Sequence, residues 1–294
     1  TVSPSPTLTR TATRTRTATA TRTITPRPSP TATPTSAPAP PSVVGPWDNY
    51  TVAAPRVILD GGKYLLWYDG RNLTAPESGW AVGLAWSPDG IAWTRYPQNP
   101  VLGPGGGLAA SLAWDANSRY QVAVLKDGLT FKMWFCGSDG FTYQTGYATS
   151  ADGIRWDIYA GNPVLTVGPA GSWEEYEANG PSVIKDGDVY KMWYHGCDAA
   201  YTACGIGYAT SPDGTAWTKH AGNPVLSGAP GEWDQNSVMW PAVIKNGSIY
   251  EMWYTANGKI GRATSPDGIL WTKEASNPVL TQGWDGGMAA QASV

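Results

Sequence analysis

Carboxylates, amides and aromatic rings that could bind or process a sugar gather in loops that interrupt an otherwise regular repeat. These candidate groups differ from one repeat to the next: Asp69, Arg71, Asp139, Tyr143, Glu177, Asn179, His195, Asp198 and Trp240. Aromatic rings stack on the apolar face of a sugar, while acids hydrogen-bond its hydroxyls or transfer protons. The residue types therefore favour a carbohydrate as the partner of these loops.

The repeat that must position these residues is a cassette that occurs four times. Each copy has an Asp-Gly turn, a Trp four residues after that Asp, and Asn-Pro-Val-Leu beginning ten residues after it. The copies begin at Asp89, Asp152, Asp213 and Asp267. An aromatic pair such as Trp193-Tyr194 precedes each copy, which makes the full unit about 60 residues long. Long-period repeats of short β-like runs are typical of an all-β propeller.

Alignment of the units predicts four strands in each, which we call A to D. Strand A begins at Pro55, Val122, Pro181 and Pro241, strand B carries the aromatic pair, and strand D carries the cassette Trp. The A-B turns and the C-D turns have constant lengths, as tight hairpins do. From the strand B Trp to strand C, in contrast, the chain takes 15, 11, 13 and 7 residues.

The length variation falls on one face of the predicted propeller, because strands alternate in direction and the B-C and D-A loops share a face. Variable loops on a rigid scaffold are where binding sites usually lie. Each D-A loop also carries a Trp-acid pair eight residues before strand A, such as Trp47-Asp48 or Trp173-Glu174. We expect these regularly spaced pairs to lock blades together rather than to bind a ligand.

The first 46 residues differ in composition from the rest. They contain no acidic and no aromatic residue and consist mostly of Thr, Pro, Ala and Ser, with Thr at every odd position from Thr7 to Thr25. Three interpretations of this arm, residues 1–46, stay open: an O-glycosylated stalk, a linker, or an extended strand that pairs with another segment. Residues 47–294 are long enough for one sizeable propeller core.

Charge and hydropathy exclude some classes of function. Residues 47–294 carry 15 basic and 23 acidic side chains, a formal net charge of −8, which argues against nucleic acid as partner. No run of 18 apolar residues exists, so the sequence predicts no membrane span. Cys197 and Cys204 flank a short loop and could form a disulfide, whereas Cys136 has no evident partner. We expect a secreted or cell-surface protein, although no signal peptide is visible.

Several strings resemble the five-bladed propellers of glycoside hydrolase family 43 and its relatives in families 32, 68 and 130. Examples are Pro181-Ser182-Val183-Ile184-Lys185-Asp186-Gly187 and Gly207-Tyr208-Ala209-Thr210-Ser211-Pro212-Asp213-Gly214. The resemblance covers residues 47–294 and implies a five-bladed fold, with four complete four-stranded blades and the start of a fifth at Trp284-Asp285.

The same resemblance implies a catalytic set that this chain matches only in part. Family 43 enzymes use aspartates just before strand A, where this chain has Ala54, Gln121, Gly180 and Trp240. Glu177 lies near the position of the family's general acid, with Asp48 or Asp69 as its partner carboxylate. With two histidines and no Cys/His ligand spacing, the sequence gives no metal site or other cofactor, and an axial calcium ion is left open.

Two functions follow from these observations. The missing aspartates, the incomplete fifth unit and the strand-like arm favour a non-catalytic extracellular propeller for glycan binding or surface assembly, self-associating into filaments through its arm. The alternative is a glycoside hydrolase-like enzyme that acts on a polysaccharide or oligosaccharide at the face formed by the B-C and D-A loops.

Overall fold

A computed structural model describes residues 47–71, 79–104, 113–235, 237–281 and 289–294. The arm and Trp284-Asp285 lie outside the described residues, as do the expectations that rest on them. All regular elements in the described part of the chain are β-strands, which confirms the all-β prediction. No helix capable of crossing a membrane is found there.

The strands form three sheets, which contain four antiparallel units that we call blades 1 to 4; a parallel pair between β7 and β9, Tyr143 opposite Glu177, joins blades 2 and 3 into one sheet. Blade 1 contains β1 (Thr51–Asp60), β2 (Lys63–Arg71), β3 (Ala81–Ser87) and β4 (Thr94–Arg95). Blade 2 contains β5 (Ser118–Asp127), β6 (Thr130–Ser138), β7 (Tyr143–Ser150) and β8 (Asp157–Ile158). Blade 3 contains β9 (Glu177–Asp186), β10 (Val189–Cys197), β11 (Cys204–Ser211) and β12 (Thr218–Lys219), and β13 (Leu226–Ser227) also pairs with β11. Blade 4 contains β14 (Met239–Asn246), β15 (Ile249–Ala256), β16 (Lys259–Ser265) and β17 (Thr272–Lys273).

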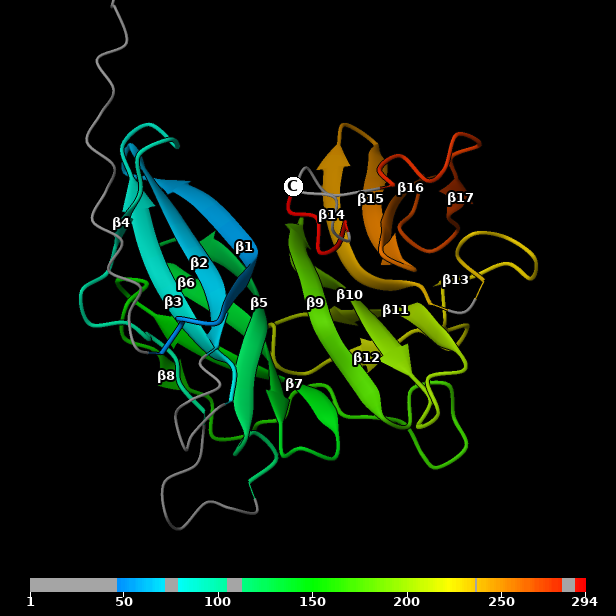
Figure 1. The fold of residues 1–294 in the computed structure, drawn as a ribbon, viewed down its shortest axis with the longest axis horizontal. Coiled ribbons are helices and arrows are strands. Elements are labelled where there is room, and N and C mark those ends of the chain that lie inside the picture. Colours follow the sequence, from blue (N-terminus) through cyan, green and yellow to red (C-terminus); the bar gives the residue numbers. More distant parts are fainter. Residues whose placement is uncertain (1–46, 72–78, 105–112, 236, 282–288) are drawn as a thin grey trace, which may run out of the picture. The chain divides into compact units, whose positions relative to one another are not determined.

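The blades are arranged as in a β-propeller. Figure 1 shows β1, β5, β9 and β14 nearest the middle, and the segment at the C-terminus lies beside them. Each of these inner strands is longer than the sequence predicted, because a bulge lets the strand continue on the N-terminal side of its predicted start. In β1 the pairing register shifts between Ala53 and Arg56, and Ala54 in the bulge has a positive φ of 48°.

The conserved spacing of the cassette has a structural cause, which blade 3 illustrates. Asp213 Oδ1 accepts hydrogen bonds from the backbone N–H groups of Thr215 and Ala216 at 2.7 and 2.9 Å and so closes the C-D turn. The Asn223 side chain clamps strand C, accepting from Tyr208 N–H at 2.9 Å and donating to Tyr208 C=O at 3.1 Å. The same contacts recur in the other three blades, so the cassette builds the blade rather than a binding site.

Neighbouring blades are held together by the strand B tryptophans. Trp67, Trp134 and Trp193 are fully buried and insert into the following blade. Their indole N–H groups donate to the carbonyls of Gly153, Gly214 and Gly268 at 3.0, 2.8 and 2.8 Å. In blade 2, the slot that receives Trp67 includes Met133, Ala148 and Trp156. These three interfaces contain the three hydrophobic clusters of the described core.

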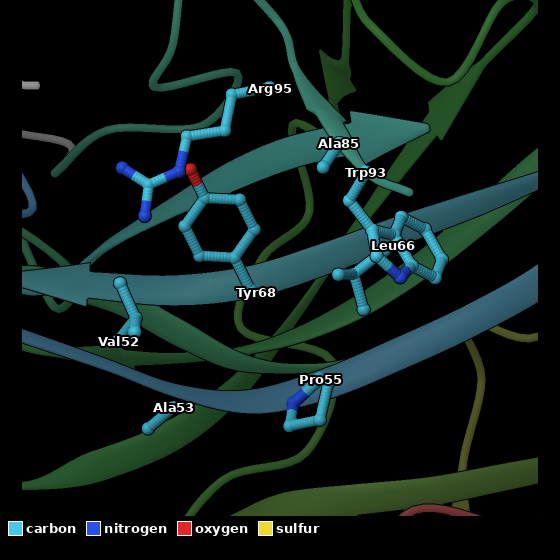
Figure 2. A pocket seen from close by; sticks show the side chains of 8 residues that line it. All are labelled: Val52, Ala53, Pro55, Leu66, Tyr68, Ala85, Trp93 and Arg95. Atoms are coloured by element: carbon cyan, nitrogen blue, oxygen red, sulfur yellow. The ribbon is translucent and has the colours of Figure 1, made fainter. Parts of the chain in front are cut away.

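The corresponding slot of blade 1 is a cavity of about 400 Å³. Figure 2 shows Leu66, Ala85 and Trp93 around it, the equivalents of the residues that surround Trp67 in blade 2. At the other end of the series, Trp253 of blade 4 is only half-buried. Its ring is covered by Arg262, whose Cζ lies 5.6 Å from the ring centroid. Among the described residues, the interlock that joins the other blades is therefore missing both at Trp253 and at the slot of blade 1.

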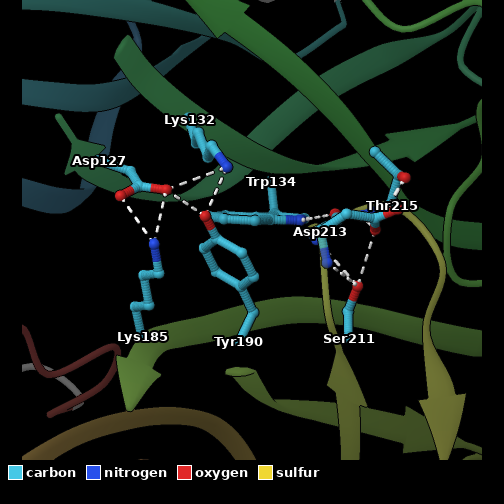
Figure 3. Close-up of polar contacts among 9 residues, drawn as sticks. Asp127, Lys132, Trp134, Lys185, Tyr190, Ser211, Asp213 and Thr215 are labelled. Atoms are coloured by element: carbon cyan, nitrogen blue, oxygen red, sulfur yellow. Dashed lines mark hydrogen bonds and ion pairs between the residues drawn. The ribbon is translucent and has the colours of Figure 1, made fainter. Parts of the chain in front are cut away.

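Ion pairs join the blades at the A-B turns. Figure 3 shows Asp127, from the β5–β6 turn, bound by Lys185 of the next blade at 2.9 Å, by Lys132 and by the Tyr190 hydroxyl. The same arrangement recurs around Asp186, which binds Lys245 at 2.6 Å and Lys191 at 2.8 Å. The Tyr190 and Lys185 hydrogen bonds hold the pKa of Asp127 well below its usual range, and the Lys191 and Lys245 bonds do so for Asp186.

These carboxylates predict how the fold responds to acid. Because their folded-state pKa values are depressed, their contribution to stability is present above the unfolded-state pKa of about 4 and is lost as the pH falls below it. We expect the double variant Asp127→Asn, Asp186→Asn to be less stable than the wild type at pH 7 and to differ much less at pH 2.5. Urea unfolding at both pH values measures this. The exposed Asp188→Asn change controls for net charge, and an equal deficit at both pH values would contradict the prediction.

Candidate functional site

The inner strands meet around an axis lined by residues with unusual backbone geometry. Five residues near the axis have left-handed φ angles of 48° to 59°: Ala54, Gln121, Gly180, Trp240 and Gln291, of which the first four lie at bulges of β1, β5, β9 and β14. Together with Arg56 they border an axial cavity of about 10 Å³, roughly one water molecule. Four of the five are not glycine, and strained residues of this kind cluster at functional sites. The four positions before strand A that the sequence singled out are therefore brought to one place.

The segment Ala289–Val294 takes the place of a further inner strand. Gln291 N–H donates to Thr255 Oγ1 at 2.9 Å, just as Gln121 N–H donates to the Asp69 carboxylate at 3.0 Å. Thr255 and Asp69 occupy equivalent positions on β15 and β2, two residues after the strand B Trp. The segment 289–294, which follows the predicted start of another unit, thus lies beside the axis.

Beside the axis, blade 3 carries a hydrogen-bonded group of three side chains. Glu177 at the start of β9 contacts His195 of β10, with Oε2 and Nε2 3.0 Å apart. The other carboxylate oxygen of Glu177 accepts a hydrogen bond from the Tyr201 hydroxyl. Burial alone would raise the pKa of Glu177, but hydrogen bonds and charge from His195, together with the Tyr201 bond, hold it below its ordinary value.

In the neutral tautomer that carries its proton on Nε2, His195 donates to the Glu177 carboxylate and Nδ1 holds a lone pair. Nδ1 is buried and has no hydrogen-bond partner among the described residues. A Cβ atom at position 180 would lie only 2.4 Å from Nδ1, so a glycine is required there for the imidazole to fit. The Glu177 contact and the close fit against Gly180 thus fix the orientation of the His195 imidazole.

Other polar atoms around the axis also lack partners in the described structure. Asn179 Oδ1, Gln121 Oε1 and Trp240 Nε1 are buried without a hydrogen bond. A buried polar group without a partner costs free energy, and such groups in a native structure call for a ligand or ordered water. Two acceptors and one indole donor beside His195 match the hydrogen-bonding groups of a polyhydroxylated ligand.

Asp69 of β2 is a second buried carboxyl close to this axis. Burial raises its pKa to about 8, against the lowering effects of the Gln121 N–H bond and of Arg56. The buried thiol of Cys136 is close enough to both carboxyls to feel their charge. Burial is the main cause of its raised pKa, and the charges of Glu177 and Asp69 raise it further. At neutral pH the site therefore combines an ionised Glu177 with a protonated Asp69.

The raised pKa of Asp69 predicts an effect on stability. The folded protein retains a proton that the unfolded chain loses near pH 4, so Asp69 lowers the free energy of unfolding as the pH rises from about 4 to about 8. Asp69→Asn keeps an acceptor for Gln121 N–H and removes the titration. We expect this variant to exceed the wild type in stability at pH 8.5 and to match it near pH 4. Urea midpoints at the two pH values test this, and a pH-independent difference would contradict it.

Asp48 does not join these carboxyls. It is buried and accepts from the Tyr68 hydroxyl at 3.1 Å and from Arg95 at 3.0 Å. The equivalent Asp234 binds the Tyr254 hydroxyl at 3.1 Å and Lys273 at 2.6 Å. These contacts fix the loops that enter blades 1 and 4 to strands of the same blade, so these two acids do not join neighbouring blades as we expected, and Asp48 has a structural set of partners.

The remaining binding candidates have local roles. Asp139 Oδ1 accepts from the N–H groups of Phe141 and Thr142 at 2.8 Å each, and Asp198 accepts from Thr202 N–H at 2.7 Å, so both close turns. Arg71 lies over the Trp80 ring. Tyr143 packs edge-on against Tyr176, which in turn packs against Tyr201. Of the predicted residues, Asp69, Glu177, Asn179, His195 and Trp240 gather at the axis.

Sequence reasoning missed Tyr201 and the contribution of Gln121. Tyr201 lies in the loop between Cys197 and Cys204, which form a disulfide with an S–S distance of 2.08 Å. The signal that could have found Tyr201 is this pair of cysteines, which directs the one aromatic residue between them toward the neighbouring strand. Gln121 was noted only as the residue in place of an aspartate.

The axis offers little to a metal ion. Among the residues that the structure describes, no group of three or more His, Cys, Asp or Glu side chains is placed to hold one. The axial cavity is bordered by the Arg56 guanidinium and by no carboxylate. Calcium takes six to eight oxygen ligands, often carboxylates, so this lining does not fit it.

Comparisons with known proteins bear on the fold. No family model matches the chain. An uncharacterized protein of Mycobacterium tuberculosis is 28% identical over 230 residues, which cover 74% of this chain and 71% of that protein. An A type blood N-acetyl-alpha-D-galactosamine deacetylase of Flavonifractor plautii is 27% identical over 158 residues, covering 50% of this chain and 20% of that enzyme.

Solved structures share the architecture. A family 117 glycoside hydrolase of Zobellia galactanivorans superposes with a TM-score of 0.63 and 16% identity, covering 76% of this chain and 69% of its own. A structure from a study of family 130 mannoside phosphorylases and hydrolases superposes with a TM-score of 0.65 and 16% identity, covering 84% of this chain and 77% of its own. The chain therefore has a propeller-like fold found in glycoside hydrolases, and these likenesses do not single out family 43.

Proposed function

We propose that the protein is a glycoside hydrolase-type enzyme that acts on an oligosaccharide or polysaccharide at the axial site of Glu177, His195 and Asp69. The observation that carries this proposal is the pair of buried carboxyls whose pKa values are displaced in opposite directions. A protonated and an ionised group held at one site are the two forms that acid–base catalysis needs. The proposal replaces general-acid catalysis by Glu177 with a role in orienting and stabilising His195, which acts as the base.

In the proposed reaction, a water molecule attacks the anomeric carbon. Its proton passes to His195 Nδ1, and the resulting imidazolium is stabilised by the Glu177 carboxylate on Nε2. The glycosidic bond breaks, and the departing oxygen takes the proton of Asp69. The unpartnered Asn179 and Trp240 groups hydrogen-bond sugar hydroxyls, and the half-exposed Tyr201 ring packs on the sugar.

The compared proteins support a carbohydrate as substrate. The family 117 neighbour is a glycoside hydrolase, and the Flavonifractor plautii relative is named for deacetylation of an N-acetylgalactosamine. They give no support to the non-catalytic surface assembly that the sequence favoured. That interpretation depended on the arm, residues 1–46, which lies outside the described residues.

A panel of aryl glycosides and polysaccharides, assayed for released aglycone or reducing ends, tests the proposal. We expect turnover of at least one substrate, lost in Glu177→Gln and in Asp69→Asn although the latter is more stable at pH 8.5. Asp139→Asn, in a turn of the same face, is the matched control and should retain activity. Turnover that persists in Glu177→Gln would refute the assignment of this site.

We propose in addition that the ring has five positions and that the chain acts outside the cytoplasm. Four bulges with left-handed residues, together with the left-handed Gln291 beside the same axial cavity, support the first statement. The Cys197–Cys204 disulfide, typical of oxidising compartments, supports the second. A crystal structure that placed Gln291 away from the axis would overturn the five positions, and a cytoplasmic location in fractionated cells would overturn the second statement.

A further inference from the structure

The loop of residues 198–203, which connects β10 to β11, is closed at its base by the Cys197–Cys204 disulfide. The two cysteines are directly opposed across the strands, with a Cα–Cα distance of 4.3 Å. On the other side of β10, Cys197 is opposed to Glu177 of β9. The disulfide and the Glu177 carboxylate therefore stand at the same level of three adjacent strands.

Hydrogen bonds fold this loop back over Glu177. Asp198 accepts from Thr202 N–H at 2.7 Å, and its C=O accepts from Tyr201 N–H at 3.1 Å. Tyr201 has a left-handed φ of 53°, which a non-glycine residue adopts only when its surroundings impose it. The tight loop thereby turns the Tyr201 side chain back onto the Glu177 carboxylate.

Tyr201 and His195 divide the two oxygens of Glu177 between them. The Tyr201 hydroxyl occupies Oε1 and the His195 imidazole occupies Oε2. A carboxylate fixed on both oxygens cannot rotate, so the imidazole it binds is fixed as well, with Nδ1 toward the axis. Without Tyr201, the carboxylate could turn and release His195.

We propose that the disulfide-closed loop 198–203 is a redox-dependent positioning element, which holds Glu177 on His195 through Tyr201 only while Cys197 and Cys204 are oxidised. This inference rests on the proposed function for its effect on catalysis. A dithiol reductant would transfer two electrons and two protons to the disulfide, giving two thiols on the protein and one disulfide on the reductant. Tyr201 is a positioning residue here, since it acts through Glu177.

The other groups that face Glu177 do not compete for this role. Besides Asn179, they are Tyr120 of β5, Cys136 of β6, and Tyr143 of β7. Burial is the largest cause of the raised pKa of each of these three groups, and the charge of Glu177 adds to it. All three are therefore neutral across the pH range in which Glu177 titrates, and the buried Cys136 thiol is a poor participant in thiol exchange.

The test follows the titration of Glu177 itself. Carbon-13 NMR of side-chain carboxyls, with the Glu177 signal assigned by its loss in Glu177→Gln, gives the midpoint in the oxidised wild type. We expect Tyr201→Phe to raise that midpoint, because the lost hydrogen bond favoured the ionised form. Dithiothreitol should raise it in the wild type, and the Cys197→Ser, Cys204→Ser double variant should show the raised midpoint without reductant. Tyr176→Phe, an aromatic neighbour, is the control.

The matching kinetic expectation is that Tyr201→Phe and the reduced wild type shift the acidic limb of the kcat/KM profile upward in pH. A Glu177 midpoint that is the same in Tyr201→Phe, or the same before and after reduction, would overturn the inference. Because the NMR titration needs no substrate, a shifted midpoint in a protein without any glycosidase activity would refute the proposed function and leave the positioning role intact. Tyr201→Phe retains the disulfide, so the inference can be tested even if the cysteine variants fold poorly.

Discussion

Trp193→Ala is expected to lower the free energy of unfolding by about 3–5 kcal/mol. The Trp193 ring is fully buried between blades 3 and 4, where it packs against Tyr208, Tyr250 and Trp271. Its indole N–H also donates to Gly268 C=O at 2.8 Å. Truncation removes the packed ring, leaves a cavity, and leaves the Gly268 carbonyl without its hydrogen-bond donor. Since domains are stable by about 5–15 kcal/mol, the loss would bring the fold close to its limit.

The repeat supplies a matched control at the equivalent position of blade 4. Trp253 has the same place on its strand B, but its ring is half-buried and no following blade receives it among the described residues. We expect Trp253→Ala to cost about 1 kcal/mol, a typical surface-proximal effect. Urea unfolding of the two variants measures the difference. Equal losses would mean that Trp253 is interlocked like the others.

The difference between these two tryptophans also marks what a sequence can and cannot specify. The Asp-Gly turns, the strand B aromatics and the Asn clamps act within one blade, so their spacing alone predicted the strands of all four units. Whether a strand B Trp inserts into a following blade depends on whether a blade stands next to it in the ring. Trp193 and Trp253 sit in nearly the same sequence context, and only the structure distinguishes them.

The sequence predicted which residues form the site better than it predicted what each of them does. Glu177, Asn179 and His195 were found because they depart from the repeat, and the strand pairing of β9 with β10 does bring them together. The role of Glu177 depended on a pKa that reflects His195 and Tyr201, two partners that lie 18 and 24 residues away. Burial raises the pKa of both carboxyls: at Glu177 the contacts with His195 and Tyr201 outweigh it, whereas at Asp69 it outweighs the Gln121 N–H bond and the charge of Arg56. No local pattern encodes that balance.

His195→Gln is the prediction that separates an oriented base from a structural imidazole. If His195 Nδ1 accepts the proton of the attacking water, kcat/KM on the substrate found by the panel should fall by about 10²–10⁴-fold, the usual contribution of a general base. Glutamine can still hydrogen-bond to Glu177, so the fold should be retained. His220→Gln is the control, because His220 lies at a partly exposed turn where its ring accepts from Gly222 N–H.

The double variant His195→Gln, Glu177→Gln then decides whether the two residues act together. Groups that act as one unit give strongly non-additive losses, so we expect the double variant to be no more than a fewfold worse than the poorer single variant. Multiplied losses would mean that Glu177 and His195 serve separate steps, in which case Glu177 would contact the substrate itself instead of orienting the imidazole. The hydrogen bond between Oε2 and Nε2 favours the coupled outcome, because Tyr201 and His195 engage both Glu177 oxygens, and the imidazole Nδ1 is the nitrogen of this group without a hydrogen-bond partner among the described residues.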